Sequence, residues 1–359
     1  MTNKSKELII DGKSISEHSP TYFIADIAAN HDGDLARAKR LIWLAKEAGA
    51  DAAKFQHFKA ESIVSDFGFK SLGQRKSHQS KWKKSVFDVY KEASVSLDWT
   101  LELKKTCKEA DITFFTSPYA FDLVDKIDPH VPAYKIGSGE ITWIDLIKYI
   151  ASKGKPYIIA SGASTSEDVE RAIKAASEIN DQVALLQCNT NYTASVENMK
   201  FVNLNVLKYY KKIYPNIILG LSDHTPGHAT VLGAVALGAK IIEKHFTDDR
   251  RREGPDHAFS MDPISWKDMV ERTRELEAAL GSDFKRIEAN EMETVILQRR
   301  AVRVNKNIHE GSKLKMSDVD FLRPCPVDAI PPFNIEKYLN KPLKKTIVKG
   351  DYLKENDFF

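Results

Sequence analysis

Tyr22–Phe58 reads YFIADIAANHDGDLARAKRLIWLAKEAGADAAKFQHF, and this stretch decides the fold. It opens with Tyr22–Ile27, a mostly apolar run that is typical of a buried strand. Residues 35–48 then repeat apolar side chains at helical spacing, and Gly49 is a typical helix stop. The pattern returns to a strand at Ala52–Phe58. The stretch therefore predicts a strand–helix–strand unit.

The same alternation continues along most of the chain. We expect eight strands, near Tyr22–Ile27, Ala52–Phe58, Thr113–Thr116, Ala133–Ile136, Tyr157–Ala160, Val183–Gln187, Ile217–Leu221 and Ile241–Glu243. Helical patterns separate them, and Ser164 with Glu167 has the spacing of a capping box for one of these helices. Eight strands alternating with helices over roughly 250 residues predict an α/β fold, a (β/α)8 TIM barrel. An open doubly wound sheet is the alternative, because a strand count cannot prove closure.

Two smaller segments flank the predicted barrel. Before it, Glu7–Ile10 and Ser14–Ser16 surround the turn signal Asp11-Gly12 and predict a hairpin over the barrel floor. After Gly281 the pattern changes to a charged helical stretch and then to short strand-like pieces, at Ala301–Val304, Asp320–Leu322 and Leu343–Ile347. We therefore expect a TIM-barrel domain at 1–283, a helical linker at 284–298 and a small mostly-β domain at 299–359.

Composition excludes several classes of protein. The 359 residues carry a formal net charge of +3, so no electrostatic case arises for binding nucleic acid or an anionic membrane. The longest apolar stretch is about half the length of a membrane span, and the first residues do not resemble a secretory signal. Three widely spaced cysteines suggest neither a disulfide framework nor a cysteine metal site, so we expect a cytoplasmic protein.

Two lysines stand inside otherwise apolar strand patterns. Lys54 and Lys135 would point into a barrel, where an ammonium group needs an anionic partner. Serines 117, 138 and 222 follow predicted strands at the same rim, so these groups can hold a small substrate with phosphate and carboxylate groups. The alternative is a buried salt bridge of a lysine with Asp26 or Glu140.

Two histidines end consecutive predicted strands. Neighbouring strands lie about 5 Å apart, so the imidazoles of His224 and His245 can share one divalent ion. With two protein ligands, such an ion keeps open positions for water or substrate, which suits a Lewis acid. Alternatively, each histidine hydrogen-bonds the backbone of its loop.

Six motifs in this order resemble the sialic acid (nonulosonate) synthase family, and the similarity covers nearly the whole chain. They are Ala25–Gly33 (ADIAANHDG), Ala53–Gln56 (AKFQ), Tyr134–Glu140 (YKIGSGE), Gly220–Thr225 (GLSDHT), Ile242–Phe246 (IEKHF) and Glu253–His257 (EGPDH). The tail from Arg299 through Pro324 resembles the C-terminal antifreeze-like (SAF) domain of the same family.

The resemblance implies a barrel enzyme that condenses phosphoenolpyruvate with the open-chain aldehyde of an N-acetylated amino sugar. It implies Mn²⁺ or Mg²⁺ on His224 and His245, and phosphoenolpyruvate contacts from Lys54, Lys135, Ser117, Ser138, Thr190 and Ser222. Sugar contacts would come from Gln56, Tyr192 and Asp256, and residues 65–91 would form a lid with Lys70, Gln74, Arg75 and Trp82. Members of the family are swapped homodimers in which an arginine of the small domain reaches the partner's site. Arg323 matches that position here.

The sequence departs from the family pattern at two informative positions. The acid of the first motif is usually Glu and is Asp26 here, which moves the carboxylate by about one methylene. The usual Ser-Thr-Gly after the fifth strand reads Ala160-Ser161-Gly162, so Ser161 would replace a missing hydroxyl. With Glu140, Asp26 is a candidate for guiding water or its proton.

Two other functions compete with this one. A Schiff-base aldolase would use Lys54 or Lys135 as a nucleophile, but it needs a lysine that is desolvated without a bound anion. A carbohydrate- or ice-binding protein without catalysis is suggested by the tail alone.

Overall fold

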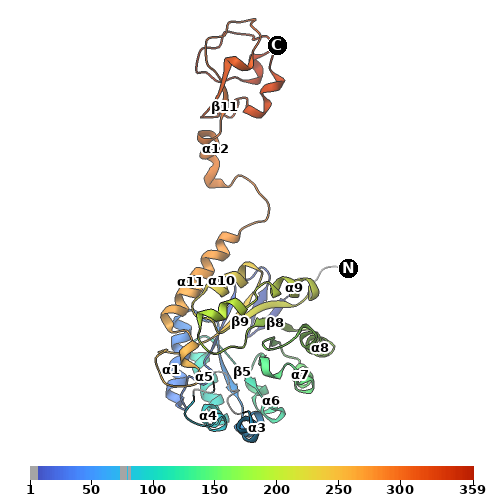
Figure 1. The fold of residues 1–359 in the computed structure, drawn as a ribbon, viewed down its shortest axis with the longest axis vertical. Coiled ribbons are helices and arrows are strands. Elements are labelled where there is room, and N and C mark those ends of the chain that lie inside the picture. Colours follow the sequence, from blue (N-terminus) through green and yellow to red (C-terminus); the bar gives the residue numbers. More distant parts are fainter. Residues whose placement is uncertain (1–6, 73–78, 80–81) are drawn as a thin grey trace. The chain divides into compact units, whose positions relative to one another are not determined.

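The computed structural model describes residues 7–72, 79 and 82–359. The chain divides into two compact units, Met1–Gly281 and Ser282–Phe359. In the first unit, strands form a central cylinder and helices surround it (Figure 1). Within the described part of the chain, none of the helices has the length and apolar character that a bilayer span requires.

Eight parallel strands close into a barrel in the order β10-β3-β4-β5-β6-β7-β8-β9. They are β3 (Tyr22–Asp26), β4 (Ala52–His57), β5 (Thr113–Pro118), β6 (Tyr134–Ile136), β7 (Tyr157–Ala160), β8 (Val183–Cys188), β9 (Ile218–Asp223) and β10 (Ile241–His245). The last strand, β10, pairs with both β9 and β3. The prediction of a TIM barrel is confirmed, and the open-sheet alternative is wrong, because the first and last strands are hydrogen-bonded.

Four of the predicted strands end too early, β5 by two residues, β8 by one, and β9 and β10 by two each. β9 continues through Ser222 and Asp223, and β10 continues through Lys244 and His245. The polar side chains at these four positions suggested a loop. A strand, however, needs only backbone pairing, and the barrel gives each of these side chains a polar neighbour. The site residues at this rim are therefore held by the rigid ladder of the sheet.

Helices surround the barrel, and most of them turn an apolar face toward it. These helices are α1 (Leu35–Glu47), α2 (Ala60–Ile63), α3 (Asp66–Ser71), α4 (Val86–Ala93), α5 (Thr100–Glu109), α6 (Phe121–Ile127), α7 (Ile144–Ala151), α8 (Ser166–Ser177), α9 (Val206–Ile213), α10 (Ala229–Ala236) and α11 (Pro263–Leu280). Among them, α3 has no buried residue. Leu41 and Ile42 of α1 are fully buried, as the spacing predicts. Full burial of each such side chain contributes about 1.5–3 kcal/mol to folding.

The capping box of α8 lies one residue later than predicted. Thr165 accepts from the backbone N–H of Asp168, and the Asp168 carboxylate accepts from the backbone N–H of Thr165. Ser164 and Glu167 have the same spacing, but the Ser164 hydroxyl donates to the carbonyl of Gly162 in the preceding turn. The local turn therefore decides between two equivalent sequence patterns.

The predicted hairpin is confirmed. It consists of β1 (Glu7–Ile10) and β2 (Lys13–Ser16), which pair antiparallel. Leu8, Ile10 and Ile15 are buried in the barrel core. Thr113, the first residue of β5, donates to Asp11 of the turn, so the hairpin covers the amino ends of the strands. The opposite end of the barrel carries the polar rim.

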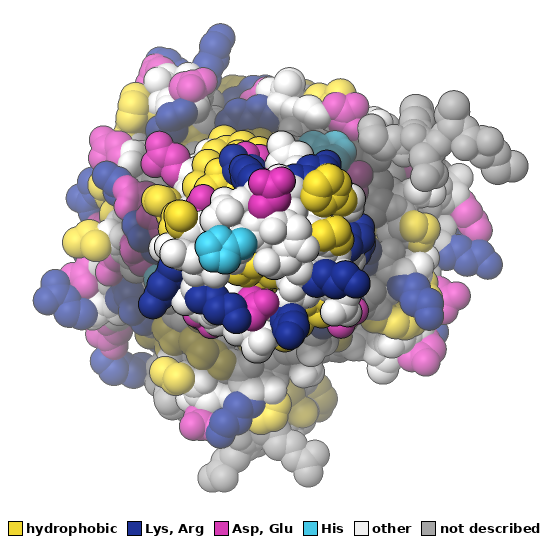
Figure 2. All heavy atoms as spheres, turned by 90° about the horizontal axis from the view of Figure 1, so that it is seen from above, with side chains coloured by type: hydrophobic (Ala, Val, Ile, Leu, Met, Phe, Trp, Pro, Cys, Tyr) yellow, Lys and Arg dark blue, Asp and Glu magenta, His cyan; other side chains and the backbone are white. Residues whose placement is uncertain are grey.

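The second unit has its own apolar core. α12 (Met292–Gln298) precedes an antiparallel pair of β11 (Ala301–Val304) and β12 (Val319–Leu322). The predicted strand at Leu343–Ile347 does not form, although Leu343 and Ile347 each make an isolated bridge and are buried in this core. On the face seen in Figure 2, basic and acidic side chains are interspersed among the described residues.

A buried ion pair ties β9 to β10 outside the cylinder. The Lys244 ammonium contacts the Asp223 carboxylate, which also accepts from the hydroxyls of Thr225 and Thr230. Asp223→Ala leaves the ammonium buried without its counter-charge, so we expect the free energy of unfolding to fall by about 3–5 kcal/mol. Asp249→Ala is the control, because it breaks an exposed pair with Arg251. Equal losses for both variants in urea unfolding would contradict the assignment.

Candidate active site

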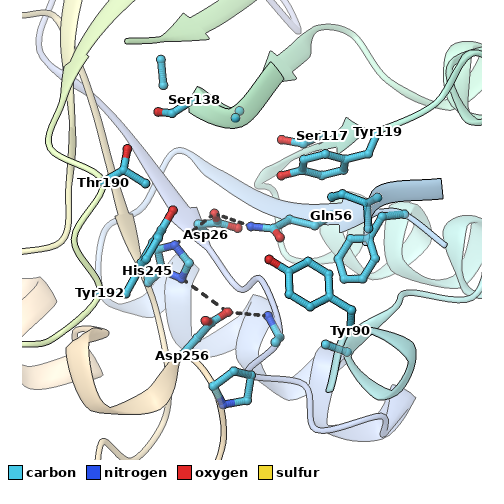
Figure 3. A pocket seen from close by; sticks show the side chains of 18 of the residues that line it. Asp26, Gln56, Tyr90, Ser117, Tyr119, Ser138, Thr190, Tyr192, His245 and Asp256 are labelled. Carbon is cyan, nitrogen blue, oxygen red and sulfur yellow. Dashed lines mark hydrogen bonds and ion pairs between the residues drawn. The ribbon is translucent and has the colours of Figure 1, made fainter. Parts of the chain in front are cut away.

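A cavity of about 340 Å³ opens where the barrel strands end. Most of the residues singled out from the sequence line it: Asp26, Lys54, Gln56, Ser117, Lys135, Ser138, Glu140, Thr190, Tyr192, Ser222, His224, His245 and Asp256. In Figure 3, Gln56, Tyr90 and Tyr119 lie on one side of this cavity, and Tyr192 and His245 lie on the other. The structure therefore brings together side chains that are up to 230 positions apart in the sequence, as from Asp26 to Asp256.

Strand register places the charged residues side by side. Asp26 of β3 pairs with Lys54 of β4 on one edge and with His245 of β10 on the other. Ser222 of β9 pairs with Glu243 of β10. Paired residues of parallel strands point to the same face of the sheet, so all five point toward the cavity.

Asp26 and Lys54 form the central ion pair of the cavity. Lys54 Nζ lies 2.6 Å from Asp26 Oδ2, and Gln56 Nε2 donates to the same oxygen at 3.1 Å. Burial lowers the pKa of Lys54, but Asp26 and Glu243 outweigh it, so the pKa of this ammonium is raised. The salt bridge between Lys54 and Asp26, which was the alternative to a role in anion binding, thus exists. It lies in the same cavity as the candidate anion contacts. A Schiff-base role is disfavoured for Lys54, because that chemistry needs a neutral amine.

Glu243 is a cavity residue to which sequence reasoning gave no role. Its Oε1 lies 3.8 Å from Lys54 Nζ, and its Oε2 lies 3.6 Å from Lys135 Nζ. The alternation of β10 contained the signal, because residues 243 and 245 share a face and His245 was already assigned to the cavity. Tyr90 and Tyr119 were also missed; they follow from no motif and reach the wall by tertiary packing.

Hydroxyl groups gather beside the lysines. Ser117 Oγ is buried and has no hydrogen-bond partner among the described residues. Ser138 Oγ accepts from the backbone N–H of Gly162 at 3.0 Å. A Cβ at Gly162 would stand 1.7 Å from Thr190 Oγ1 and 2.7 Å from Ser138 Oγ, so only glycine lets these two hydroxyls converge. Together they offer donors to an anionic group held near the lysines.

The two histidine rings face each other with centroids 5.4 Å apart. His224 Nδ1 lies 3.1 Å from the carbonyl of Asn189. Burial lowers the pKa of His224, but a hydrogen bond with the Cys188 side chain outweighs burial, so the pKa of this imidazole is raised. His245 Nδ1 is buried without a hydrogen-bond partner among the described residues. Burial first, then His224 and Lys54, hold the pKa of His245 well below its usual value. A neutral imidazole with an unpartnered nitrogen is the form that ligates a divalent ion, and His245 has this form. His224 would join it as a ligand by giving up its hydrogen bond with Cys188.

The ion would depend on few protein ligands. Over residues 7–72, 79 and 82–359, no group of three or more His, Cys, Asp or Glu side chains has a metal-binding arrangement. Asp26 Oδ2 lies 3.6 Å from His245 Nε2, beyond hydrogen-bond length. Two imidazoles would leave most coordination positions to water and substrate, as expected from the sequence.

The loop that carries Asp256 is fastened to the start of α1. His257 Nε2 lies 2.8 Å from Asp32 Oδ1, and Arg252 Nη2 donates to Asp32 Oδ2 at 2.8 Å. Asp256 Oδ2 in turn accepts from the backbone N–H of Ala29 at 3.1 Å. Burial raises the pKa of Asp256 to about 6. The motif Glu253–His257 therefore places a carboxyl group at the cavity wall.

The predicted lid is described only in part. Trp82 and Tyr90 line the cavity, whereas Gln74 and Arg75 lie outside the described residues. Lys70 is exposed and pairs with Asp66 at 2.6 Å. Trp82 and Tyr192 also line an adjoining outer chamber of about 790 Å³, so the cavity continues beyond the histidines.

One predicted site residue of the first unit, Ser161, is not part of this cavity wall. Ser161 Oγ donates to the carbonyl of Leu186 at 3.0 Å, and the preceding residue, Ala160, lines the cavity instead. Alternation along β7 turns residues 160 and 161 to opposite faces, which is why Ser161 does not supply the missing hydroxyl. Arg323 belongs to the second unit, where its Nε donates to the carbonyl of Gln298 at 2.6 Å. Its contact with the partner's site stays a prediction.

Glu140 is a titratable group at the mouth of the cavity. Burial raises its pKa to about 7, although Lys135 pulls in the opposite direction. A carboxyl group with a pKa near neutrality can accept or release a proton during catalysis. Glu140 is thus a better candidate for proton transfer than a carboxylate locked in an ion pair.

Comparison with known proteins shows the family of this chain. The NeuB family model matches residues 41–285. N-acetylneuraminate-9-phosphate synthase from Homo sapiens is 32% identical over 96% of this chain and 94% of its own length. N,N'-diacetyllegionaminic acid synthase from Legionella pneumophila is 33% identical over 92% and 93%. The crystal structure of spore coat polysaccharide biosynthesis protein spsE from Bacillus subtilis has a TM-score of 0.64 at 29% identity, over 98% of this chain and 99% of that one. The chain therefore belongs to the NeuB family, the sialic acid (nonulosonate) synthases, and is an enzyme.

Proposed function

We propose that this enzyme condenses phosphoenolpyruvate with the open-chain aldehyde of an N-acetylated amino sugar. The products are a nine-carbon 2-keto acid sugar and phosphate. The observation that carries the proposal is the convergence of Lys54, Lys135 and the imidazoles of His224 and His245 on one cavity. The relatives named above, which make N-acetylneuraminate 9-phosphate and diacetyllegionaminic acid, support the same reaction class.

Phosphoenolpyruvate would lie against the lysines. The Lys135 ammonium has three N–H groups and makes one hydrogen bond among the described residues, to the carbonyl of Ile136. Its other N–H groups can therefore donate to an anionic oxygen, in competition with the Glu243 carboxylate 3.6 Å away. Hydroxyl donors for phosphate and carboxylate would come from Ser117, Ser138, Thr190 and Ser222.

The sugar would occupy the side of the cavity that opens to the outer chamber. Gln56, Tyr192 and Asp256 would contact its hydroxyl and acetamido groups. His224 and His245 would hold Mn²⁺ or Mg²⁺. Such an ion supplies Lewis-acid polarisation of the aldehyde oxygen and a template for its orientation.

The chemistry balances without a further reactant. Carbon 3 of phosphoenolpyruvate forms a bond to the aldehyde carbon, and positive character develops at carbon 2. Water adds there and gives up one proton, while the former aldehyde oxygen takes up one proton and becomes a hydroxyl group. The C–O bond to phosphate then breaks, and the second proton of the water leaves with the phosphate as the ketone forms. Glu140 accepts the proton of this water, Asp26 holds Lys54 in place, and both lysines offset the negative charge of the substrate.

Two further expectations belong to the proposal. Family resemblance supports a swapped homodimer, in which Arg323 of each subunit contacts the sugar in the partner's site. The free cysteines and the use of phosphoenolpyruvate support a cytoplasmic enzyme. Sedimentation of the full chain and the sugar KM of Arg323→Ala test the first expectation.

Phosphate release identifies the acceptor sugar. We expect phosphate to appear when phosphoenolpyruvate is supplied with one of three aldoses: N-acetylmannosamine, its 6-phosphate or a 2,4-diacetamido-6-deoxy sugar. In ¹⁸O-water, the label should enter the ketone of the product, because water adds to carbon 2. Label in phosphate, or no release with any of these aldoses, contradicts the proposal.

Removing either imidazole should abolish ion binding. For His224→Ala and His245→Ala, we expect calorimetric binding of Mn²⁺ to weaken by at least about a hundredfold, because each supplies one of two protein ligands. His228→Ala is the control, since His228 pairs with Asp268 outside the cavity. Unchanged binding in both cavity variants, or unchanged turnover after complete chelation, counts against the ion site.

The pH dependence of turnover should report Glu140. The proposed proton acceptor is the carboxylate form, and this form is lost as the pH falls through about 7. At saturating substrates, kcat should therefore reach half of its maximum near pH 7 and level off above that pH. Glu140→Gln should lower kcat by about 100-fold or more and remove this dependence, with little change in the KM for phosphoenolpyruvate. If kcat of Glu140→Gln still rises with pH in the same range, the pH dependence belongs to another group.

A further inference from the structure

The carboxylate of Glu243 lies between the two lysines that the proposed function assigns to the substrate anion. It is 3.8 Å from Lys54 Nζ and 3.6 Å from Lys135 Nζ, and the residue is 5% exposed. Lys54 and Lys135 come from β4 and β6, with β5 between them, and Glu243 reaches both from β10. One negative charge thus faces two ammonium groups inside the cavity.

Glu243 is held differently from the other carboxylate at this site. Asp26 accepts hydrogen bonds from the backbone N–H of Ala28 and from Gln56, and it forms a close pair with Lys54. Glu243 Oε2 is buried and has no hydrogen-bond partner among the described residues, and Ser222 reaches Oε1 at 3.5 Å. Directional bonds fix Asp26, whereas charge attraction at a distance holds Glu243.

We propose that Glu243 is an internal counter-anion that weakens the binding of anions to Lys54 and Lys135. This inference rests on the proposed function only for the identity of the anion. A phosphate oxygen at Lys135 would stand beside the Glu243 carboxylate, and like charges at such separations repel strongly in a poorly solvated cavity. The ligand must compete with Glu243 to bind, and the same repulsion hastens the departure of product phosphate. Glu243 therefore sets the phosphate affinity of the site.

Whether anion affinity rises or falls when Glu243 is replaced separates a competing counter-anion from a residue that only positions the lysines. If Glu243 only kept the lysines in position, its loss would weaken anion binding. If it competes with the anion, its loss strengthens anion binding. Glu243→Gln keeps the shape of the side chain and removes its charge. Glu243→Asp keeps the charge but draws it back from the lysines by about one methylene.

The experiment is calorimetric titration of the full chain with inorganic phosphate, at one fixed concentration of Mn²⁺. We expect Glu243→Gln to bind phosphate at least about tenfold more tightly than the unchanged protein, and Glu243→Asp to fall between the two. Glu197→Gln is the matched control for net charge, because Glu197 pairs with Lys200 on the surface. It should leave phosphate affinity unchanged. In Glu243→Gln with Lys135→Gln, the gain should disappear.

Phosphate affinity in Glu243→Gln that is unchanged or weaker overturns the proposal. If that variant does not fold, Glu243→Asp decides, since it must still bind phosphate more tightly than the unchanged protein. The titration needs neither sugar nor turnover. If Glu243→Gln binds phosphate more tightly but no acceptor sugar supports turnover, the proposed function alone is overturned. If turnover is observed but Glu243→Gln does not bind phosphate more tightly, this inference alone is overturned.

Discussion

The active site depends on pairing buried ammonium groups with carboxylates at the mouth of the barrel. A charged lysine inside a protein is unstable without a counter-charge, and both Lys54 and Lys135 are 2% exposed. Asp26 and Glu243 supply those charges from β3 and β10. These are the first and last strands of the cylinder, so the charge balance of the cavity is completed only where the barrel closes.

Interactions behind the cavity wall hold its groups in place. The Asp223–Lys244 pair joins β9 to β10 from outside, and the neighbouring residues on both strands point inward as Ser222, Glu243 and His245. Gly220 allows β9 to approach β10 closely, because a Cβ at this position would stand 2.3 Å from the carbonyl oxygen of Ile241. Polar groups on the two faces of these strands thus serve different purposes, with stability outside and chemistry inside.

Sequence reasoning found most of the cavity and failed in instructive ways. It assigned His245 but not Glu243, although alternation puts both on one face of β10. It assigned Ser161, although alternation places that hydroxyl behind Ala160 and against Leu186. Neither error came from a wrong strand boundary, because Glu243 lay inside its predicted strand and β7 ends at Ala160 as predicted. Both errors came from leaving side-chain direction out of the sequence reasoning. Tyr119 and Tyr90 had no local signal, since their position depends on packing between segments far apart in the sequence.

The sequence by itself determined the fold class and the kind of chemistry. Alternating strand and helix periods predict a barrel, and charged residues inside apolar strands are costly enough to mark a site wherever they occur. Tertiary structure decided which charges meet. Lys54 pairs with Asp26, and Glu243 approaches both lysines, because strand register and barrel closure set distances that no local pattern encodes. For the same reason, only the folded chain could assign Glu140 a pKa near neutrality, since burial is a property of the whole fold.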